Sequence, residues 1–449
     1  MTASPPTSAV LSLRQEARLR TNGLSDGHQV VCLTFDVRGP LDPGALHEAL
    51  VRVASRHDAL RMALEPAGDG EYVPSFPAVS EVPFTVEDAA GGDVGELLAR
   101  LTAAEQGTPL DLHHGPLLRA RVIRVSDERH LLALVTEHLV ADGKGQQQLC
   151  DEVAAAYEAA RGGASWDPAP PSGQFWEYAA WQRELLAGPE RDELHEHWRE
   201  HLGGEIPRLR IGDRDATEPS LPLGQMLPLP DHLRDGHFNT RLLPEGSAAR
   251  IAAFCREERV TNYVVGAATM AVLLAVATGS DAVVMLSPFA ARPPMFADVV
   301  GDFSTPLPVR FQVDRGAPIR ELLHEVRGVV LDSIENEQLP YPEINRVVRN
   351  TALPYNRIAY FGADNAIALR LGTAEAVKFE APVQTALFEL SFWLISNGPE
   401  VRVSSDHRAH SFSHAVARRW NDAYAHVLDA VLSGPDRTVQ AVMDELGSL

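Results

Sequence analysis

The chain contains 449 residues, of which 45% are hydrophobic and 22% charged, a composition typical of a globular protein with a large core. Its length favours two lobes of roughly 200 residues over a single core. Lysine and arginine total 40 against 61 aspartates and glutamates, and the resulting formal charge of -21 disfavours nucleic acid and anionic membrane lipids as partners.

Cysteines and apolar segments indicate the cellular compartment. Cys32, Cys150 and Cys255 are scattered and show neither metal-ligand spacing nor a disulfide framework, which fits a reducing cytoplasm. The opening MTASPPTSAV has no basic start followed by an apolar run, so we expect no signal peptide. The longest apolar run, residues 263–277, is shorter than the roughly 20 residues of a membrane span. We therefore expect a cytoplasmic protein in which this run is a buried helix.

The first predicted elements are a strand, a helix and a hairpin. Apolar side chains alternate with polar ones over residues 31–37, which predicts a strand with one face in the core. A helix is predicted to follow, from Pro43 to about His57, with Asp42 as its N-cap. Residues 60–76 are expected to form a hairpin around a glycine-rich turn.

The next segment leads to the most informative motif. Residues 116–138 predict two strands joined by a polar turn at 126–128, and the second strand is almost continuously apolar, as a central strand is. After Asp142, apolar residues recur at helical spacing as far as residues 162–163. His138 is therefore expected where a buried strand passes into a helix.

The remaining pattern is also mixed. Proline-rich residues 166–173 predict a linker, followed by one polar helix that contains Trp181 and Trp198. We expect an α/β (α+β) fold with an N-terminal lobe, a connecting helix and linker, and a C-terminal lobe, at residues 1–175, 176–235 and 236–449. In the last lobe the predicted elements are an alanine-rich helix, the helix at 263–277, and strands at 281–286, FELSFWLIS and VRVSSDH.

The stretch VTEHLVADGKG carries the candidate chemistry. A neutral histidine, with an unperturbed pKa near 6.5, can take a proton from an amine or alcohol that attacks a thioester. A core or capping histidine is the alternative for His138. Because side chains alternate along a strand, Glu137 is expected to point away from His138. Asp142 is expected to hold the loop through an arginine instead of forming a triad.

Three other patterns are weaker candidates. The double histidine of LHHGPLL has Leu118 where an aspartate would be needed, and a strand-entry loop is expected. HWREH, from His197 to His201, matches a zinc-peptidase pattern, but no third ligand is identifiable, so we expect a solvated helix and no metal. HLGGEI has Ile206 in place of the serine of a carrier-protein motif, so no carrier segment is expected here.

Several segments together resemble the condensation domains of nonribosomal peptide synthetases. LSLRQEARL and RHDALRMAL are similar to the family's first two motifs, and EHLVADGKGQQQLCDEV is similar to its H-H-x-x-x-D-G motif and the helix that follows. QFWEYAAWQRE, SPFAARPPMFADVVGDFSTPLPVR, ENEQLPYPEI and FELSFWLIS then occur in family order. The resemblance covers nearly the whole chain.

The resemblance implies two chloramphenicol-acetyltransferase-like lobes in a V, with a central tunnel. It implies that His138 is the second motif histidine, that Asp142 pairs structurally with Arg292, and that the backbone N–H of Gly143 lies near the reacting carbonyl. The expected reaction transfers an acyl thioester to an amine or alcohol. The substrate would arrive on the phosphopantetheine arm of a carrier protein acting in trans, with no cofactor bound directly, and a free-standing monomer is expected.

The chain also departs from the family pattern. Glu137 replaces the first motif histidine, Lys144 and Gly145 stand where Trp-Ser is usual, and residues 305–306 replace the usual Asn-Thr. Glu137 is expected to support the site, and these changes put the substrate class in doubt more than the reaction class. Two alternatives stay open: a catalytically silent module that binds a carrier or another enzyme, and a coenzyme A-dependent acyltransferase, although GDFST differs from the D-F-G-W-G element of that class.

Overall fold

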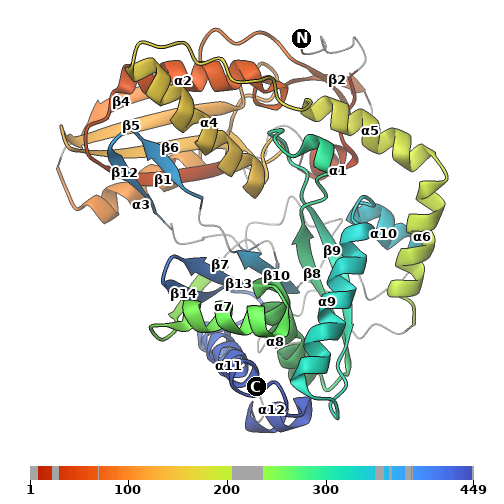
Figure 1. Cartoon of the computed structure of the whole chain (residues 1–449). Helices are drawn as coiled ribbons and strands as arrows, with labels where there is room; N and C mark the ends of the chain where they lie inside the picture. The colour runs from red at the N-terminus through yellow and green to blue at the C-terminus, as the bar shows by residue number, and fades with distance from the viewer. Residues whose placement is uncertain are drawn as a thin grey trace. The chain divides into compact units, whose positions relative to one another are not determined.

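The computed structural model describes residues 9–22, 30–68, 70–89, 91–204, 236–348, 358–363, 367–379, 386 and 388–446. Two compact units can be distinguished by their internal contacts (Figure 1). Unit 1 comprises Met1–Gly188, Arg292–Ser304 and Ile367–Ala381. Unit 2 comprises Pro189–Ala291, Thr305–Ala366 and Pro382–Leu449. Both units mix helices and strands, as expected; the lobe boundaries given above stay a prediction.

Unit 1 is built on a six-stranded sheet in the order β11-β12-β1-β6-β5-β4. The strands are β1 (Val30–Arg38), β4 (Phe84–Asp88), β5 (Leu118–Ser126), β6 (Arg129–Glu137), β11 (Leu369–Leu371) and β12 (Ala374–Phe379). The predicted strands at 31–37 and 116–138 are thus confirmed. β11 and β12 were not predicted, and they join β1 from more than 300 residues further along the chain.

Helices α2 (Pro43–Arg56) and α4 (Gly143–Arg161) pack together, and α3 (Val94–Gln106) packs on β1 and β6. Unit 1 also contains α1 (Leu13–Asn22), α5 (Phe175–Ala187) and a small hairpin of β2 (Ala63–Gly68) and β3 (Glu71–Ser75). Asp42 caps α2 as predicted, because its Oδ1 accepts hydrogen bonds from the backbone N–H groups of Gly44 and Ala45 at 2.9 and 3.1 Å.

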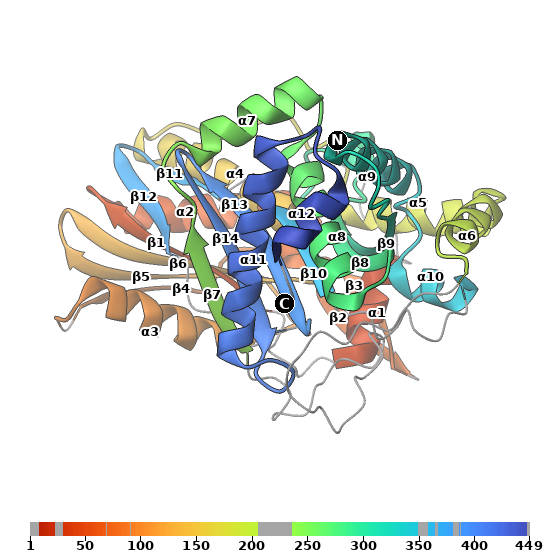
Figure 2. The same cartoon turned by 90° about the horizontal axis from the view of Figure 1, so that it is seen from below.

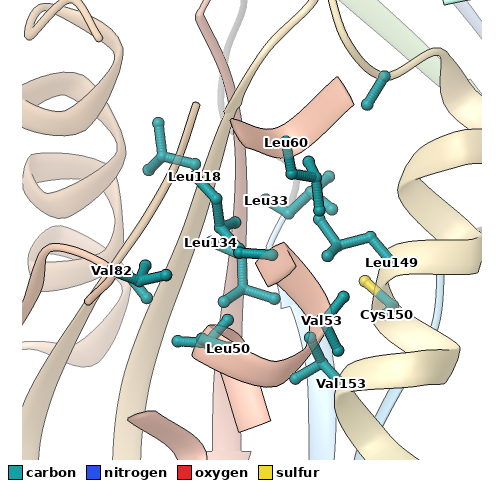
Figure 3. Close-up of a cluster of buried hydrophobic side chains, with 14 of the residues drawn as sticks. Leu33, Leu50, Val53, Leu60, Val82, Leu118, Leu134, Leu149, Cys150 and Val153 are labelled. Carbon is teal, nitrogen blue, oxygen red and sulfur yellow. The ribbon is translucent and has the colours of Figure 1, made fainter. Parts of the chain in front are cut away.

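The core of unit 1 lies between α2, α4 and one face of the sheet (Figure 3). Leu50 of α2, Leu149 of α4 and Leu134 of β6 are at most 1% exposed and belong to the same cluster. Full burial of one such side chain stabilises the fold by about 1.5–3 kcal/mol. Thr34 is on the opposite face of β1 from Leu33, and its hydroxyl bonds Thr102 of α3 at 2.8 Å. The sheet is therefore buried on both sides.

Unit 2 has a second six-stranded sheet in the order β7-β14-β13-β10-β8-β9. Its strands are β7 (Gly236–Leu242), β8 (Ala282–Phe289), β9 (Thr305–Gln312), β10 (Ile358–Ala363), β13 (Leu390–Asn397) and β14 (Glu400–Arg408). Its helices are α6 (Glu190–His201), α7 (Ser247–Glu258), α8 (Asn262–Thr278), α9 (Ile319–Glu335), α10 (Tyr341–Val348), α11 (His414–Ser433) and α12 (Val439–Leu446). The strands predicted at 281–286, FELSFWLIS and VRVSSDH are β8, β13 and β14.

The predicted apolar helix is the buried α8, which packs beside α11 (Figure 2). Thr261 caps it and Gly279, at φ 69°, ends it, as the sequence suggested. Gly266 permits close packing, since a Cβ atom there would lie 1.7 Å from the Tyr360 hydroxyl oxygen. Within the described residues no single helix is long and apolar enough to cross a membrane. The bent pair α7–α8 reaches the length and hydropathy of a membrane span when its two helices are taken together.

One helix prediction was wrong. The single polar helix expected to contain Trp181 and Trp198 is two helices, α5 and α6, which belong to different units. The break falls at Gly188-Pro189. Glycine readily ends a helix and proline cannot continue one, because it lacks the N–H and restricts the residue before it.

Candidate functional site

The candidate site in unit 1 is the turn between β6 and α4. β6 is buried along almost its whole length and pairs with β1 and β5 on its two sides. The strand ends at Glu137, and residues 138–142 then form the turn that begins α4. Asp142 caps α4, since its Oδ1 accepts from the N–H of Gly145 at 2.7 Å. The turn is therefore held at both ends by regular structure.

Asp142 and Arg292 form a buried ion pair. Their Oδ1 and Nη2 atoms lie 3.0 Å apart, and the two side chains are 4% and 3% exposed. The other carboxylate oxygen of Asp142 accepts from the backbone N–H groups of Phe303 and Ser304 at 3.0 and 3.1 Å. Burial raises the pKa of Asp142, whereas Arg292 and the backbone N–H groups lower it. The pKa of Asp142 is raised overall, and the four donors to its carboxylate offset part of the effect of burial.

Arg292 connects the turn to the segment 292–304. Its Nη1 donates to the carbonyl oxygen of Phe296 at 3.2 Å and to that of Val299, and its guanidinium lies 3.8 Å from the ring centroid of Phe303. The backbone N–H of Asp142 also donates to the carbonyl of Gly301 at 3.0 Å. The side chains of Asp142 and Arg292 are buried at the centre of this network, whose geometry is that of a structural support.

His138 begins the turn, and its ring is half-buried. The side chain is 35% exposed, and its Nδ1 lies 3.2 Å from Nη2 of Arg18 and 3.7 Å from Oδ1 of Asp302. Burial, Arg18 and Arg14 lower the pKa of His138 to about 4, against an opposing attraction from Asp302. Solvent reaching the exposed part of the ring screens some of this repulsion, but the imidazole is neutral at pH 7 either way.

Two arginines of α1 and one aspartate surround Nδ1 of His138. Oδ2 of Asp302 accepts from Nε of Arg14 at 3.0 Å and from Nε of Arg18 at 2.9 Å. Asp302 is 1% exposed. Burial alone would raise the pKa of Asp302, but Arg14, Arg18 and His138 lower this pKa to about 2. Burial and Arg14 lower the pKa of Arg18 to about 10, so its guanidinium stays charged at pH 7.

Glu137 is buried beside the same arginine. It is 5% exposed, and burial raises its pKa to about 7 while attraction to Arg18 works in the opposite direction. Arg18 affects the pKa values of both Glu137 and His138, so the two residues share one electrostatic neighbour. The expectation that their side chains point apart stays a prediction. The alternation argument does not extend to His138, which lies beyond the end of β6. The sequence named no cation for Glu137; attraction to Arg18, and to a smaller extent to Arg119, lowers its pKa.

Gly143 and Lys144 form the exposed first turn of α4. Among the described residues, no atom lies within 4 Å of a Cβ placed on Gly143, so their packing does not require glycine there. At Gly145, in contrast, a Cβ would lie 3.0 Å from the carbonyl oxygen of Gly301. The N–H of Gly143 is at a helix N-terminus, where it can donate to a negatively charged oxygen; its contact with a reacting carbonyl stays a prediction.

Comparison with known proteins decides the family. The sequence matches the family model described as "Condensation domain" over residues 7–444. The chain belongs to the condensation-domain family. Condensation domains generally catalyse amide bond formation and work with carrier proteins, although some are inactive. The two mixed units agree with the two-lobed acetyltransferase-like fold of the family.

Relatives of this condensation domain occur in much larger synthases. A component of the linear gramicidin synthase of Brevibacillus parabrevis is 26% identical over 417 residues, which are 90% of this chain and 5% of that protein. Two solved structures share the fold. The X-domain in its complex with OxyB from teicoplanin biosynthesis has a TM-score of 0.79 at 22% identity and covers 98% of this chain and 97% of its own. SgcC5 from Streptomyces globisporus has a TM-score of 0.77 at 22% identity, with coverages of 97% and 100%.

The weaker histidine patterns have structural explanations. In LHHGPLL, His113 bonds the carbonyl of Leu64 and His114 bonds Asp111, in the loop before β5. In HWREH, Nε2 of His201 accepts from the backbone N–H of Arg310 at 3.2 Å. No group of three His, Cys, Asp or Glu residues that could hold a metal occurs among the residues described. Ile206 of HLGGEI lies outside those residues.

Sequence reasoning missed Arg14, Arg18 and Asp302, although both segments were quoted for the resemblance. The two arginines are four residues apart in RQEAR, and this spacing puts them on the same face of a helix. That was a usable signal for a shared anionic partner. Asp302 follows Gly301 in GDFST, and nothing local indicates that it is buried.

Proposed function

We propose that this condensation domain transfers an acyl group from a carrier-protein thioester to an amine or alcohol, which gives an amide or an ester. The observation that carries the proposal is His138: a neutral, partly exposed imidazole on a turn that the Asp142–Arg292 pair immobilises. The carrier acts in trans, its phosphopantetheine arm delivers the substrate, and no cofactor is bound directly.

In the proposed reaction the acceptor nitrogen or oxygen forms a bond to the thioester carbonyl carbon. The carbon–sulfur bond breaks, and the phosphopantetheine thiol leaves with the proton that the acceptor gives up. Gly143 offers its backbone N–H to the oxygen that becomes negative, and His138 positions the reacting groups or moves the proton. Orientation of the two substrates supplies much of the rate, since a bound pair reacts as one molecule.

The acceptor class is open between amines and alcohols. The relatives in peptide synthases argue for an amine. SgcC5, on the other hand, was solved with (R)-(-)-1-(2-naphthyl)-1,2-ethanediol and sucrose, and a diol carries the hydroxyl groups that an ester requires. Both classes of acceptor therefore belong in the assay.

A second candidate is a catalytically silent module that binds a carrier or another enzyme. Two observations favour it. Glu137 stands at the first motif position, and the X-domain, which shares this fold, was solved in complex with OxyB. In this case the Asp142–Arg292 support would persist for stability alone.

The deciding experiment follows an acyl-carrier thioester by mass spectrometry, with pooled amines and alcohols as acceptors. It compares wild type, His138→Ala and Glu137→His, with His114→Ala as a control for an exposed histidine of the same unit. We expect product from wild type and the control, and a loss of about 100-fold in His138→Ala.

Each other result has a clear meaning. No product from wild type, together with tight carrier binding, supports the silent module. Activity that appears only in Glu137→His means that the glutamate silences an inherited site. Equal turnover of the free coenzyme A thioester and the carrier thioester supports the coenzyme A-dependent alternative.

A further inference from the structure

Unit 2 contains a groove formed by the end of α7, the first turn of α8, the second half of α9 and the end of β8 (Figure 1). Its volume is about 350 Å³. Proteins bind small molecules in pockets of about 300–1,000 Å³ with mostly apolar walls. The wall of this groove consists largely of the apolar side chains of Val260, Val264, Phe289, Val330, Leu331 and Ile334. The groove therefore has the size and lining of a small-molecule site.

One wall of the groove is a face of α9 that exposes large aliphatic side chains. Arg327, Leu331 and Ile334 follow one another at intervals of four and three residues, so they lie on the same face of the helix. Leu331 is 49% exposed and Ile334 is 46% exposed. Contiguous exposed apolar side chains mark binding sites, whereas isolated ones are normal on a protein surface. Arg327 and Ile334 are separated by about 10 Å along the helix axis, which suits an elongated molecule.

One end of the groove is positively charged. Arg259 and Arg327 line it, both are exposed, and neither guanidinium has a hydrogen bond or an ion pair among the residues described. Glu258, the residue before Arg259, forms an ion pair with Arg320 of α9 at 2.8 Å. Arg320 precedes Arg327 by about two turns, on the side away from Ile334. The two guanidinium groups are therefore at the same end of the groove, and their N–H donors suit a carboxylate.

The opposite end of the groove contains Glu337. Burial raises the pKa of Glu337, and the backbone N–H of Ala291, which donates to its carboxylate, lowers this pKa. A carboxyl group at this end disfavours a second anion close to it. The charges of the groove therefore match a molecule with one carboxylate and an apolar tail, and they oppose a molecule with a carboxylate at each end.

The backbone is strained at both ends of the groove. Among the residues described, Arg259 and Ala291 are the two non-glycine residues with positive φ, at 55° and 43°. Arg259 stands directly after α7, at the position where glycine commonly ends a helix because a side chain is disfavoured there. Strained backbone of this kind clusters at ligand-binding and other functional sites. An arginine at a position that favours glycine argues that its guanidinium has a use.

We propose that this groove binds a medium-chain aliphatic monocarboxylate. The carboxylate is held by Arg259 and Arg327, and the chain lies along Leu331 and Ile334. A protein segment would need more apolar surface, because a stable protein interface buries about 800 Å² on each partner and this face of α9 exposes two large aliphatic side chains. The site is formed by unit 2 alone, so the proposal does not rest on acyl transfer.

The first test is titration calorimetry of the full chain at neutral pH with octanoate as the probe. Octylammonium has the same chain with a positive head, and octanedioate has a carboxylate at both ends. We expect octanoate to bind at one site at least about tenfold more tightly than either of these, because hydrogen bonds to a charged group are among the stronger ones. Added salt should weaken the binding. Equal binding of octylammonium, or no saturable binding of octanoate, overturns the proposal.

The second test removes one guanidinium without a risk to folding. Glycine suits the backbone at φ 55°, so Arg259→Gly should melt at the same temperature as wild type or at a higher one. Its affinity for octanoate should fall by about tenfold or more. Arg256→Gln is the matched control, since Arg256 is an exposed arginine of the same helix that does not line the groove. Unchanged affinity in Arg259→Gly, or an equal loss in Arg256→Gln, contradicts the proposed site.

The third test places the chain of the ligand. Leu331→Gln should weaken octanoate binding by about fivefold or more through lost apolar contact, whereas Leu242→Gln should not, because Leu242 is 61% exposed on β7 outside the groove. Bound octanoate should also slow hydrogen exchange in peptides from α8 and α9 and leave β6 unchanged. Protection elsewhere in the chain, or equal effects of the two leucine substitutions, would show that octanoate adsorbs at another surface. An acidic amphipathic peptide that protects α9 where octanoate does not would replace the proposed ligand with a protein segment.

Discussion

Removal of one partner of the Asp142–Arg292 pair should destabilise unit 1 strongly. In Arg292→Met the carboxylate of Asp142 keeps the N–H groups of Gly145, Phe303 and Ser304 but loses its only cation within 4 Å among the residues described. Breaking a buried pair in this way typically costs about 3–5 kcal/mol, because the remaining charge stays buried without compensation. We expect Arg292→Met to lower the free energy of unfolding of unit 1 by an amount in this range.

A double-mutant cycle isolates the pair from the surrounding hydrogen bonds. Asp142→Asn leaves Arg292 buried without its anion, and the NH2 of the new amide can face one of the N–H donors that the carboxylate accepted from. We therefore expect Asp142→Asn to lower the free energy of unfolding by about as much as Arg292→Met. When both changes are made together, neither charge is left buried, so the double variant should cost less than the sum of the single variants by at least about 1 kcal/mol.

Hydrogen exchange is the suitable assay, because a chain with two compact units need not unfold in one step. Exchange in peptides from β6 and α4, measured against urea, reports the stability of unit 1 separately. Arg124→Met is the control, since Arg124 and Asp88 form an exposed pair at 3.7 Å, and such pairs contribute about 0–1 kcal/mol. If Arg292→Met cost no more than Arg124→Met, or if the single costs simply added, the buried pair would not be the support we describe.

Three further substitutions test the packing and the pH dependence. Gly301→Ala should destabilise unit 1 by about 1–3 kcal/mol or more, since its Cβ would lie 2.0 Å from Cδ2 of Phe175, and faster exchange in α5 would report this. Gly266→Ala should destabilise unit 2 by a similar amount through the overlap with Tyr360, with little change in α4 exchange. Burial raises the pKa of Glu137 from 4.5 to about 7, so the stability of wild type should fall as pH rises over this interval, whereas Glu137→Gln has no group to titrate there. The stability of Glu137→Gln relative to wild type should therefore increase from about pH 4.5 to about pH 7. A difference in urea midpoints that stays constant with pH would contradict the burial argument.

Features set by neighbouring residues could be predicted from the sequence. The alternation that gave β1, the cap at Asp42, and the caps of α8 at Thr261 and Gly279 depend on residues a few positions apart. The same holds for the strand-to-helix turn at His138. Local steric and hydrogen-bonding preferences determine such features, so a single sequence contains enough information to locate them.

Features set by distant residues could not be predicted in this way. β12 pairs with β1 in the register Thr34 to Phe379, and Asp302 meets Arg14 across 288 positions. Such contacts depend on where the whole unit places each segment, and no local pattern marks them. The division of the tryptophan-containing helix differs, because Gly188-Pro189 is a readable stop signal that sequence reasoning overlooked.

The cluster around His138 also bears on the departure at Glu137. Arg14 and Arg18 bring two positive charges to the site, and Asp302 balances one of them. Glu137, at its buried position beside Arg18, supplies the second anion to the extent that it is ionised. A neutral histidine at this position would remove the attraction between the Glu137 carboxylate and Arg18. Glu137→His therefore changes the electrostatic balance of the site as well as adding an imidazole, and poor activity of that variant alone would not show that glutamate is incompatible with catalysis.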